Sequence, residues 1–541
     1  MMEFAGILLA AAAAMGLARL LHLPSVPLLV LAGLGLKLSG VLPDELLVEN
    51  VVELGLAFLV FILGSELNPQ RIGAQRRAAL KIGLTQFVTL TGIGLFATWL
   101  LGFGLREAAY LGLALAASST LVVVTLLRQR QQSFEPFGRL VAGVLLLQDL
   151  LIIVLLAAMS GVDDGVSGVA IGLASVAGLM VLAWLGLRWV IPWLLVTLEL
   201  DEEGQLLTIL AVLFIFGGLA HLTGLHFVIG AFLGGVALSS FPVNGVIRGH
   251  LSSLSDFFLA VFFVSLGALL VLPGWREVVL VVLLAVLVLV VTPPLVAWIA
   301  HRAGLTGRSS IEAGLLLAQC SEFSVLVALL GREQGHLDGN MLPVIVLIAV
   351  VTMILTPFIA TDAMTWRLVW WMPSPPEPQG AARPSGHVLL LGCGDNGRDI
   401  LQELVAEGRQ VVVVDADPAV VESLRQMYPA EGKGAPPQVL AYRGDGADYR
   451  MLRLAAARSA GIIISTMRRL QDNERLLRFV RDVPVLVRVF APEEGERIER
   501  AGGRAIVYSD AAAKHFLNWF AIVREHMETR EASNQGGTTT A

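Results

Sequence analysis

The first 362 residues of this chain of 541 residues consist largely of apolar runs long enough to cross a bilayer. A membrane-spanning helix needs about 17–25 predominantly apolar residues, and in hydrocarbon only helices and closed barrels satisfy their own backbone polar groups. The runs therefore predict a polytopic α-helical membrane protein with about 13 transmembrane helices. They lie near residues 4–21, 26–42, 49–67, 80–102, 108–127, 139–160, 168–195, 205–222, 225–241, 254–272, 278–301, 311–331 and 342–363.

Composition changes sharply along the chain. The whole sequence is 56% hydrophobic and 15% charged, whereas soluble domains carry about 25% charged residues. The apolar excess ends near residue 362, and the sequence from residue 383 onward resembles a soluble domain. The net charge of −6 argues against nucleic acid as a partner. Only two cysteines, Cys320 and Cys393, are present, which excludes a disulfide framework and argues against a structural metal.

The basic residues of the short loops predict the orientation, because cytoplasmic loops carry an excess of Lys and Arg. With the N-terminus outside, most loop cations fall on the inner side, and 13 spans place the C-terminal part in the cytosol. We therefore expect a multi-pass protein of the inner (plasma) membrane of a prokaryote. The inner cations are Arg71, Arg76, Arg77, Lys81, Arg128, Arg130, Arg139, Arg248, Arg302 and Arg308.

Two stretches of the membrane region are repeated with an offset of about 200 residues. Residues 58–67 resemble residues 258–269, and residues 27–40 resemble residues 227–240. An odd linking helix between two six-helix units makes the units inverted relative to each other, as in many secondary transporters. The sequence therefore predicts an inverted repeat.

Asp149 lies in the middle of the sixth apolar run, next to Gln148. A carboxylate at the bilayer centre costs roughly 2.5–3.5 kcal/mol on insertion scales, so such residues mark ion or proton pathways. A carboxylate can hold a proton or a monovalent cation, K⁺ or Na⁺, but hardly both at once. Coupled exchange follows if the site faces each side in turn, and a single acid favours one-for-one, electroneutral exchange. The alternative is an Asp that only packs against a hydroxyl or an amide.

Polar residues interrupt the fifth and twelfth runs at corresponding places. Hydroxyls let a helix unwind because their side chains satisfy the freed backbone groups, and broken helices offer carbonyls or helix ends to ions. We therefore expect two crossed broken helices, although small residues also form ordinary helix-packing faces. The candidate residues are Ser118, Ser119 and Thr120 in the fifth run and Gln319, Ser321 and Glu322 in the twelfth.

Together these motifs resemble the Kef-type branch of the monovalent cation:proton antiporter-2 family. The resemblance covers the FILGSELNP stretch at 61–69, the Ser118–Thr120 and Gln148–Asp149 motifs, GAFLGG at 230–235, FFVSLG at 262–267 and QCSEF at 319–323. It implies a dimerisation domain, a mobile core domain and elevator-like alternating access. Asp149 would bind the ion and the proton, with Ser118, Ser119 and Thr120 at the helix crossover and K⁺ as the cation, although the family includes sodium exchangers.

The sequence departs from that branch at residues 246–252. Kef proteins carry an acidic regulatory loop there, whereas this stretch contains Arg248 and His250. Control by glutathione is therefore not expected.

The remaining chain predicts a cytosolic α/β Rossmann-like domain. We assign residues 1–364 to an exchanger-type transmembrane domain, 365–386 to a Pro/Gly-rich linker, 387–526 to the nucleotide-binding domain and 527–541 to a disordered tail. Short β-branched runs begin near residues 387, 411, 439, 462, 485 and 505 and alternate with helical stretches, which is typical of a doubly wound parallel sheet.

A glycine triad opens this domain. Gly392, Gly394 and Gly397 follow a strand and begin a helix, and Asp415 ends the next strand 18 residues later. Such glycines let phosphates approach a helix N-terminus, and the acid accepts ribose hydroxyls. Loss of the ligand from a Rossmann-like fold is the alternative. The predicted nucleotide site consists of Gly392, Gly394, Asp395, Asn396, Gly397, Asp415, Asp445, Ser465 and Thr466.

This module resembles TrkA-N domains, also called RCK domains, which bind NAD(H), AMP or related nucleotides as regulators. In this sequence Met467, Arg468 and Arg469 replace the usual acidic pair after the fourth strand, whereas Asn473 matches a frequent residue. Such domains generally dimerise, so the resemblance implies a homodimer through the membrane and RCK domains.

These features favour a K⁺:proton antiporter regulated by a nucleotide, embedded in a lipid bilayer. An RCK-gated potassium efflux channel is the alternative, but no TVGYG-like filter is present. A proton-translocating redox enzyme would need a second dinucleotide site, and one triad occurs in the right setting. We therefore expect neither an enzyme nor a catalytic cofactor.

Overall fold

The computed structural model divides the chain into two compact units, Met1–Trp370 and Trp371–Ala541. We call them the membrane unit and the soluble unit, after the domains that the sequence predicts. It describes residues 2–21, 25–40, 45–66, 76–130, 136–190, 201–239, 245–271, 273–373, 384–429 and 438–508, with residues 132, 193, 513, 516, 517, 519, 520 and 524. The tail assigned to 527–541 and residues 374–383 of the linker assigned to 365–386 lie outside these residues.

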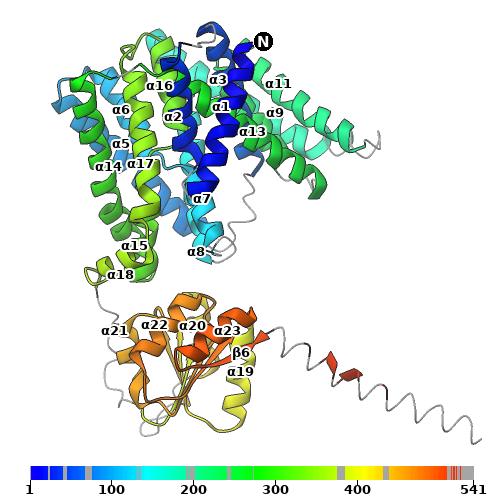
Figure 1. Cartoon of the computed structure of the whole chain (residues 1–541), viewed down its shortest axis with the longest axis vertical. Helices are drawn as coiled ribbons and strands as arrows, with labels where there is room; N and C mark the ends of the chain where they lie inside the picture. The colour runs from blue at the N-terminus through cyan, green and yellow to red at the C-terminus, as the bar shows by residue number, and fades with distance from the viewer. Residues whose placement is uncertain are drawn as a thin grey trace, which may run out of the picture. The chain divides into compact units, whose positions relative to one another are not determined.

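The membrane unit is entirely helical in its described residues (Figure 1). In chain order the helices are α1 (Met2–Leu21), α2 (Ser25–Leu38), α3 (Glu45–Glu66), α5 (Arg76–Leu100), α6 (Leu105–Ala116), α7 (Thr120–Gln129), α8 (Pro136–Met159), α9 (Gly165–Leu185), α11 (Glu202–Leu222), α12 (Phe227–Leu238), α13 (Gly245–Leu269), α14 (Trp275–Arg302), α15 (Gly307–Leu316), α16 (Phe323–Glu333), α17 (Met341–Ile359) and α18 (Asp362–Val369). Short segments η2 (Val162–Asp164) and η3 (Gly186–Val190) flank α9.

Each predicted span corresponds to a helix or to a broken helix. Among the described residues, nine helical segments are long and apolar enough to cross a membrane, and α2, α12 and the apolar part of α13 are shorter apolar helices. The pair α15 and α16 accounts for the remaining predicted span. Helix α18 continues to Val369, five residues beyond the end that the sequence suggested for the membrane domain. Large apolar side chains on the outer faces, which a bilayer would cover, include Leu84, Val88, Ile171, Val181, Phe214, Ile215, Val286 and Val290.

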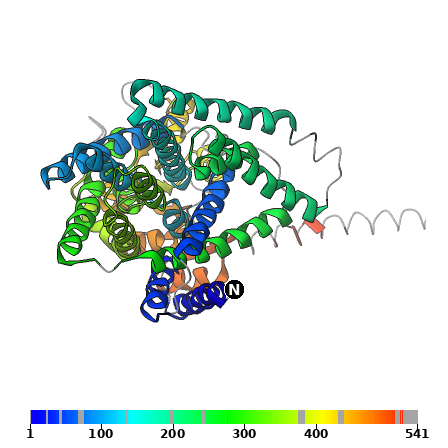
Figure 2. The same ribbon diagram turned by 90° about the horizontal axis from the view of Figure 1, so that it is seen from above.

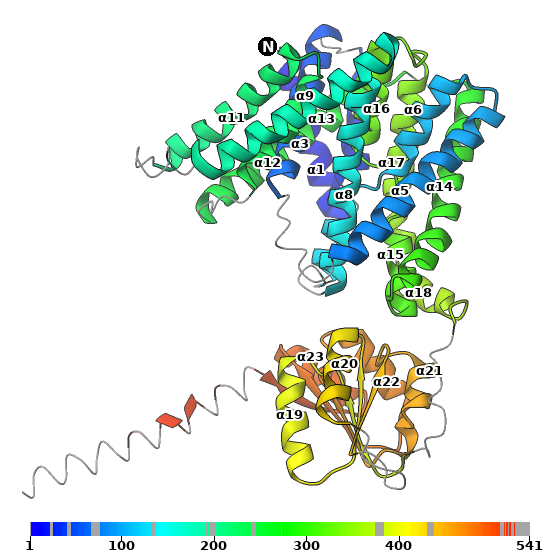
Figure 3. The same cartoon turned by 180° about the vertical axis from the view of Figure 1, so that it is seen from behind.

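The membrane helices form two groups (Figures 2 and 3). The α3 group contains α1, α2, α3, α11, α12 and α13, which pack on one another. The α8 group contains α5, α6, α7, α8, α14, α15, α16 and α17. Helix α9 packs against α8 and against α11 and α12, so it links the two groups.

Close glycine contacts confirm the internal repeat within the α3 group. A Cβ atom added to Gly235 of α12 would lie 1.9 Å from the carbonyl oxygen of Phe61 in α3. A Cβ atom added to Gly33 of α2 would lie 1.9 Å from the carbonyl oxygen of Val264 in α13. Gly33 and Phe61 stand 202 and 203 residues before Gly235 and Val264, so the α3–α12 interface recurs as the α13–α2 interface.

The α8 group repeats in the same way. A Cβ atom added to Gly112 of α6 would lie 2.6 Å from the carbonyl oxygen of Thr91 in α5, and one added to Gly314 of α15 would lie 2.4 Å from that of Pro293 in α14. Both residues of the second contact stand 202 positions after those of the first. The repeat therefore includes helix interfaces as well as sequence.

The soluble unit is the predicted doubly wound parallel sheet. Its six strands lie in the order β3-β2-β1-β4-β5-β6, and all pairs are parallel. Helices α19 and α20 pack on one face, and α21, α22 and α23 pack on the other. The elements are β1 (Val388–Leu391), α19 (Asp395–Ala406), β2 (Val411–Asp415), α20 (Pro418–Met427), β3 (Val439–Arg443), α21 (Tyr449–Leu454), β4 (Ile462–Ser465), α22 (Leu470–Phe479), β5 (Val485–Val489), α23 (Pro492–Arg500) and β6 (Arg504–Val507).

The repeated glycine contacts predict a sharp difference between two glycines of α2. Gly33→Ala should lower the free energy of unfolding by about 1–3 kcal/mol, because the new methyl group overlaps the α13 backbone. Gly35→Ala is the matched control, since no atom lies within 4 Å of its added Cβ. Thermal unfolding of the purified protein in detergent measures both. Equal effects of the two substitutions would contradict the close approach of α2 and α13.

Candidate functional site

The fifth and twelfth spans are both broken in their middle, where the sequence predicts interruptions. Helix α6 ends at Ala116 and α7 begins at Thr120, with an extended backbone at Ala117 and Ser119. The Ser119 hydroxyl caps α7 by accepting a hydrogen bond from the backbone N–H of Val122 at 3.3 Å. A capping hydroxyl satisfies an N–H group that no water reaches in a bilayer.

The break between α15 and α16 is built similarly. Helix α15 ends at Leu316 and α16 begins at Phe323. The Ser321 hydroxyl accepts a hydrogen bond from the backbone N–H of Phe323 at 3.2 Å. Gln319 donates its side-chain amide to the carbonyl oxygen of Leu316 at 3.3 Å.

Two hydrogen bonds join the two breaks. The Ser118 hydroxyl donates to the carbonyl oxygen of Leu317 at 2.8 Å, and the Ser324 hydroxyl donates to the carbonyl oxygen of Ala114 at 2.5 Å. Both pairs are buried. The broken helices therefore meet at their interruptions, and we call this meeting point the crossover.

Asp149 of α8 lies at the crossover and is fully buried. Thr120 donates its hydroxyl to Oδ2 of Asp149 at 2.9 Å, whereas Oδ1 has no hydrogen-bond partner among the described residues. The neighbouring Gln148 accepts the backbone N–H of Ser118 at 3.2 Å through Oε1. An unsatisfied carboxylate oxygen in a buried position is a ready acceptor for a proton or a cation.

Glu322 supplies a second carboxylate near Asp149. It stands directly before α16, and its side chain is almost completely buried. It interacts with the hydroxyls of Ser119 and Ser321 and with the backbone N–H of Leu121 near the start of α7. The carboxyl group of Glu322 therefore lies at the positive N-terminal end of α7, and its Oε2 atom has no hydrogen-bond partner among the described residues.

The two halves of the repeat differ in the acid. In the second half the backbone N–H of Cys320 donates to the Thr352 hydroxyl at 3.0 Å, as the N–H of Ser118 donates to Gln148 in the first. Thr352 stands 203 residues after Asp149. By this contact Thr352 corresponds to Gln148, and the residue 202 positions after Asp149 is Val351, so α17 carries no carboxylate where α8 has one.

Besides Thr352, the buried polar residues Ser324 and Gln86 at the crossover are absent from the sequence prediction. Ser324 joins the two breaks, and Gln86 of α5 places its amide nitrogen 3.5 Å from the Ser118 hydroxyl oxygen. Both side chains are fully buried. A glutamine within the fourth apolar run is the signal that marks Gln86 in the sequence.

The structure brings the glycine triad to the carboxyl ends of β1 and β2. Gly392 has a φ of +88°, and its N–H donates to the carbonyl oxygen of Val414 at 2.9 Å. A Cβ atom on Gly394, which directly precedes α19, would meet nothing within 4 Å. One on Gly397 would lie 2.5 Å from the carbonyl oxygen of Gly392. The loop is therefore tight at Gly392 and Gly397 and open at Gly394.

Asp415 faces the same loop. Its carboxylate accepts the backbone N–H groups of Cys393 at 2.6 Å and Asp417 at 2.8 Å. Burial raises the pKa of Asp415 above the usual value for aspartate, and the two N–H groups partly oppose that shift. The side chain is thus held in place beside the glycine loop.

The other residues that the sequence predicts to bind a nucleotide make different contacts. Thr466 donates its hydroxyl to the carbonyl oxygen of Gly392 at 3.0 Å, and Asp445 accepts the N–H of Ala447 at 2.8 Å. Ser465 is fully buried and donates to Oδ1 of Asn473 at 2.6 Å, so its hydroxyl serves the interior of the module. Asp395 is the first residue of α19, but its side chain lies outside the described part of the structure.

A hollow of about 320 Å³ lies beside this loop, between α19 and the strands β4, β5 and β6. Asn396, Ser465 and Thr466 of the predicted set line it, together with Arg488 and Tyr508. Burial lowers the pKa of Arg488 from its ordinary value, and the charge of Arg468 adds to that effect.

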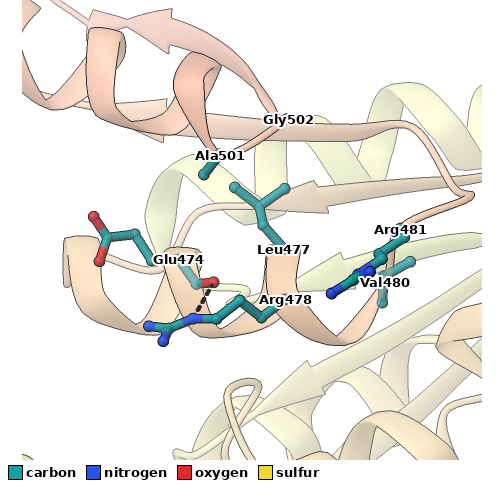
Figure 4. A pocket seen from close by; sticks show the side chains of 7 residues that line it. All are labelled: Glu474, Leu477, Arg478, Val480, Arg481, Ala501 and Gly502. Atoms are coloured by element: carbon teal, nitrogen blue, oxygen red, sulfur yellow. Dashed lines mark hydrogen bonds between the residues drawn. The ribbon is translucent and has the colours of Figure 1, made fainter.

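A larger pocket of about 570 Å³ lies elsewhere on the module (Figure 4). It is lined by Glu474, Leu477 and Arg478 of α22, by Val480 and Arg481, and by Ala501 and Gly502 after α23. Helix C-termini lie at the amino ends of parallel strands, whereas the glycine triad lies at the carboxyl ends. This pocket is therefore separate from the predicted nucleotide site.

Comparison with known proteins assigns both units. The family model described as "Sodium/hydrogen exchanger, transmembrane" matches residues 7–366, and the model of the TrkA-N domain matches residues 388–509. The solved structure of the sodium proton antiporter MjNhaP1 from Methanocaldococcus jannaschii matches with a TM-score of 0.53 and 15% identity, over 68% of this chain and 99% of its own. That likeness confirms the predicted fold of the membrane unit.

Two solved domains resemble the soluble unit. The TrkA-N domain of inner membrane protein ybaL from Escherichia coli is 20% identical, over 26% of this chain and 98% of its own, with a TM-score of 0.23. The NAD(P)-binding domain of an exopolyphosphatase-related protein from Archaeoglobus fulgidus is 24% identical, over 25% of this chain and 97% of its own, with a TM-score of 0.22.

The geometry of the glycine loop predicts opposite outcomes at two of its glycines. Gly397→Ala should destabilise the module by about 1–3 kcal/mol, because its methyl group meets the Gly392 carbonyl. Gly394→Ala should leave stability nearly unchanged, because its methyl group enters open space. Urea unfolding followed by circular dichroism tests both. A Gly394→Ala variant as unstable as Gly397→Ala would contradict the open loop.

Proposed function

The chain belongs to the transmembrane sodium/hydrogen exchanger family, and we propose that it exchanges K⁺ for protons by alternating access at Asp149. Membership in this family, together with the TrkA-N match, agrees with the resemblance to monovalent cation:proton antiporters that carry an RCK domain. The protein is thus a multi-pass membrane protein of the cation/proton antiporter class.

The environment of Asp149 carries the proposal. The carboxylate is fully buried at the crossover, and one of its oxygens has no partner among the described residues. A bound proton or a bound cation would each neutralise this charge, and the two would exclude each other. If the α8 group moves relative to the α3 group, as the family resemblance implies, the neutralised site is exposed to each side in turn.

We propose a stoichiometry of one proton for one cation. The residues 202 and 203 positions after Asp149 are Val351 and Thr352, and neither carries a charge. We infer that Glu322 keeps one charge state through the cycle, because its carboxyl group lies beside two hydroxyls and the N-terminal end of α7, although its Oε2 atom, like Oδ1 of Asp149, has no hydrogen-bond partner among the described residues. Asp149 then remains the single acid at which a proton is exchanged for a cation, and the transport cycle is electroneutral.

Two parts of the proposal rest on sequence features. These are the choice of K⁺ as the cation and the orientation of the protein in the membrane. The motifs around Asp149 resemble the Kef-type branch, and Gln148 adds a neutral amide beside the acid. Basic residues at the ends of membrane helices, such as Arg128, Arg139 and Arg302, support a cytosolic soluble module at the inner membrane of a prokaryote. We also propose a homodimer, since Ile506 and Tyr508 leave apolar surface exposed on and beside the edge strand β6.

We propose that a nucleotide such as NAD(H) or AMP regulates transport from the soluble module. The open position at Gly394 lies at the N-terminus of α19, where backbone N–H groups and the helix dipole favour phosphate. Asp415 lies next to this loop and has the chemistry to accept ribose hydroxyls.

Asp149→Asn should abolish cation-dependent proton efflux from acid-loaded proteoliposomes, because the amide neither takes up nor releases a proton. Asp164→Asn is the matched control, since Asp164 is exposed at the end of the short segment η2 and should not affect exchange. Exchange that persists in Asp149→Asn would refute the assigned role of this carboxylate. Wild-type efflux that requires an ionophore to dissipate the membrane voltage would instead favour a potassium channel.

Gly394→Asp should weaken nucleotide binding to the purified full-length protein by about tenfold or more, because it adds a negative charge where phosphate would approach. The transport rate should change without being lost. Gly394→Ala separates the effect of added charge from that of added volume. Titration of NADH and AMP by calorimetry measures both variants, and undiminished affinity in Gly394→Asp would remove the glycine loop from the site.

A further inference from the structure

Gln86 is a buried polar side chain that the account of Asp149 leaves unexplained. It lies in the middle of α5, and its side chain is fully buried. Its carboxamide oxygen has no hydrogen-bond partner among the described residues. Buried polar atoms in proteins are normally hydrogen-bonded, so an unsatisfied acceptor of this kind needs a reason.

Helix packing places Gln86 next to the crossover. A Cβ atom added to Gly83, about one turn earlier on α5, would lie 2.9 Å from a methyl carbon of Leu147 and 3.4 Å from the carbonyl oxygen of Val144. Helix α5 therefore touches α8 immediately before Gln148 and Asp149. The amide nitrogen of Gln86 lies 3.5 Å from the Ser118 hydroxyl oxygen, which itself joins the two broken helices.

Other unsatisfied polar atoms surround the same point. Oδ1 of Asp149, Oε2 of Glu322 and Oε1 of Gln319 have no partner among the described residues, and the three side chains are at most 9% exposed. Together with Oε1 of Gln86 they make two carboxylate oxygens and two neutral amide oxygens near the crossover. Oxygen atoms of this kind are the ligands that replace the hydration shell of alkali cations.

The repeat shows that this polar position belongs to one half. The residue 202 positions after Gln86 is Val288 of α14, which is buried. The second half of the repeat therefore has an apolar residue in place of Gln86 and an uncharged residue in place of Asp149. Packing of the fold does not require a glutamine at this place, since valine serves in the other half.

We propose that Gln86 is a cation ligand of the crossover, its amide oxygen completing with Asp149 the site that binds the transported cation. This inference rests on the proposed exchange at Asp149. A neutral oxygen attracts a cation more weakly than a carboxylate does, so Gln86 also favours K⁺, which loses its water more readily than Na⁺. The amide group remains oriented toward the site by Ser118.

Gln86→Met tests the proposal, because it keeps the length of the side chain and removes both polar atoms. The half-saturating K⁺ concentration for proton efflux from proteoliposomes should rise by about tenfold or more, whereas the maximal rate should stay within about twofold. Gln86→Glu should restore cation binding and shift the preference from K⁺ toward Na⁺, because a carboxylate is the stronger ligand. A lower maximal rate with an unchanged half-saturating concentration in Gln86→Met would overturn the proposal.

Thr91→Val is the matched control on the same helix. Thr91 also has a buried hydroxyl without a partner among the described residues, but it lies farther along α5, beside Gly112 of α6. Its removal should leave the half-saturating concentration unchanged. An equal increase in Thr91→Val would show that any loss of polarity in α5 suffices, and this would contradict a ligand role for Gln86.

A binding measurement separates this inference from the proposed transport function. A ligand raises the unfolding temperature only if it binds the folded protein, so K⁺ should stabilise the wild type in detergent and should stabilise Gln86→Met much less. Wild-type protein that binds K⁺ in this assay but shows no exchange would refute the transport function while leaving the ligand assignment standing. Equal stabilisation of the wild type and Gln86→Met by K⁺ would refute the ligand assignment alone.

Discussion

Every backbone polar group that leaves a helix inside a bilayer must find a partner in the protein, and the crossover meets this requirement. The hydroxyls of Ser118 and Ser324 bind carbonyl oxygens of the opposite broken helix, and those of Ser119 and Ser321 cap the new helix starts. With these groups satisfied, the chain can place unwound backbone beside a buried carboxylate. The position of Asp149 depends on this arrangement, since Thr120 at the start of α7 donates to it.

The repeat provides the framework of packed helices, and a few residues that differ between its two halves provide the polar groups of the site. Glycine contacts recur at offsets of 202 and 203 residues, so the same close helix approaches build both halves. The polar residues of the site do not recur, because Val288 stands where the first half has Gln86, and Val351 and Thr352, which stand 202 and 203 residues after Asp149, carry no charge. Because only one half of this symmetric framework carries the site, the arrangement is compatible with exchange at a single carboxylate in each transport cycle.

Features that follow from local pattern could be predicted from the sequence. Apolar length marked the spans, isolated polar residues marked both helix breaks, and β-branched runs marked all six strands. Features that depend on which helices touch could not. The sequence marks Gln86 as a polar residue in an apolar run, but its place beside the crossover is known only from the packing of α5. Ser465 ends β4 at the expected edge, yet its hydroxyl turns inward to Asn473. Periodicity gives the face of a helix or strand, but the partner across that face comes from the tertiary structure.

The central claim is that a proton and a cation compete for Asp149. The most direct measurement adds K⁺ to the purified protein in weakly buffered detergent solution and records the protons released per protomer. The account predicts that K⁺ displaces about one proton from the wild type, because a carboxylate holds one or the other, and none from Asp149→Asn. Release of the same amount from Asp149→Asn, or no release from a wild type that binds K⁺, would contradict it.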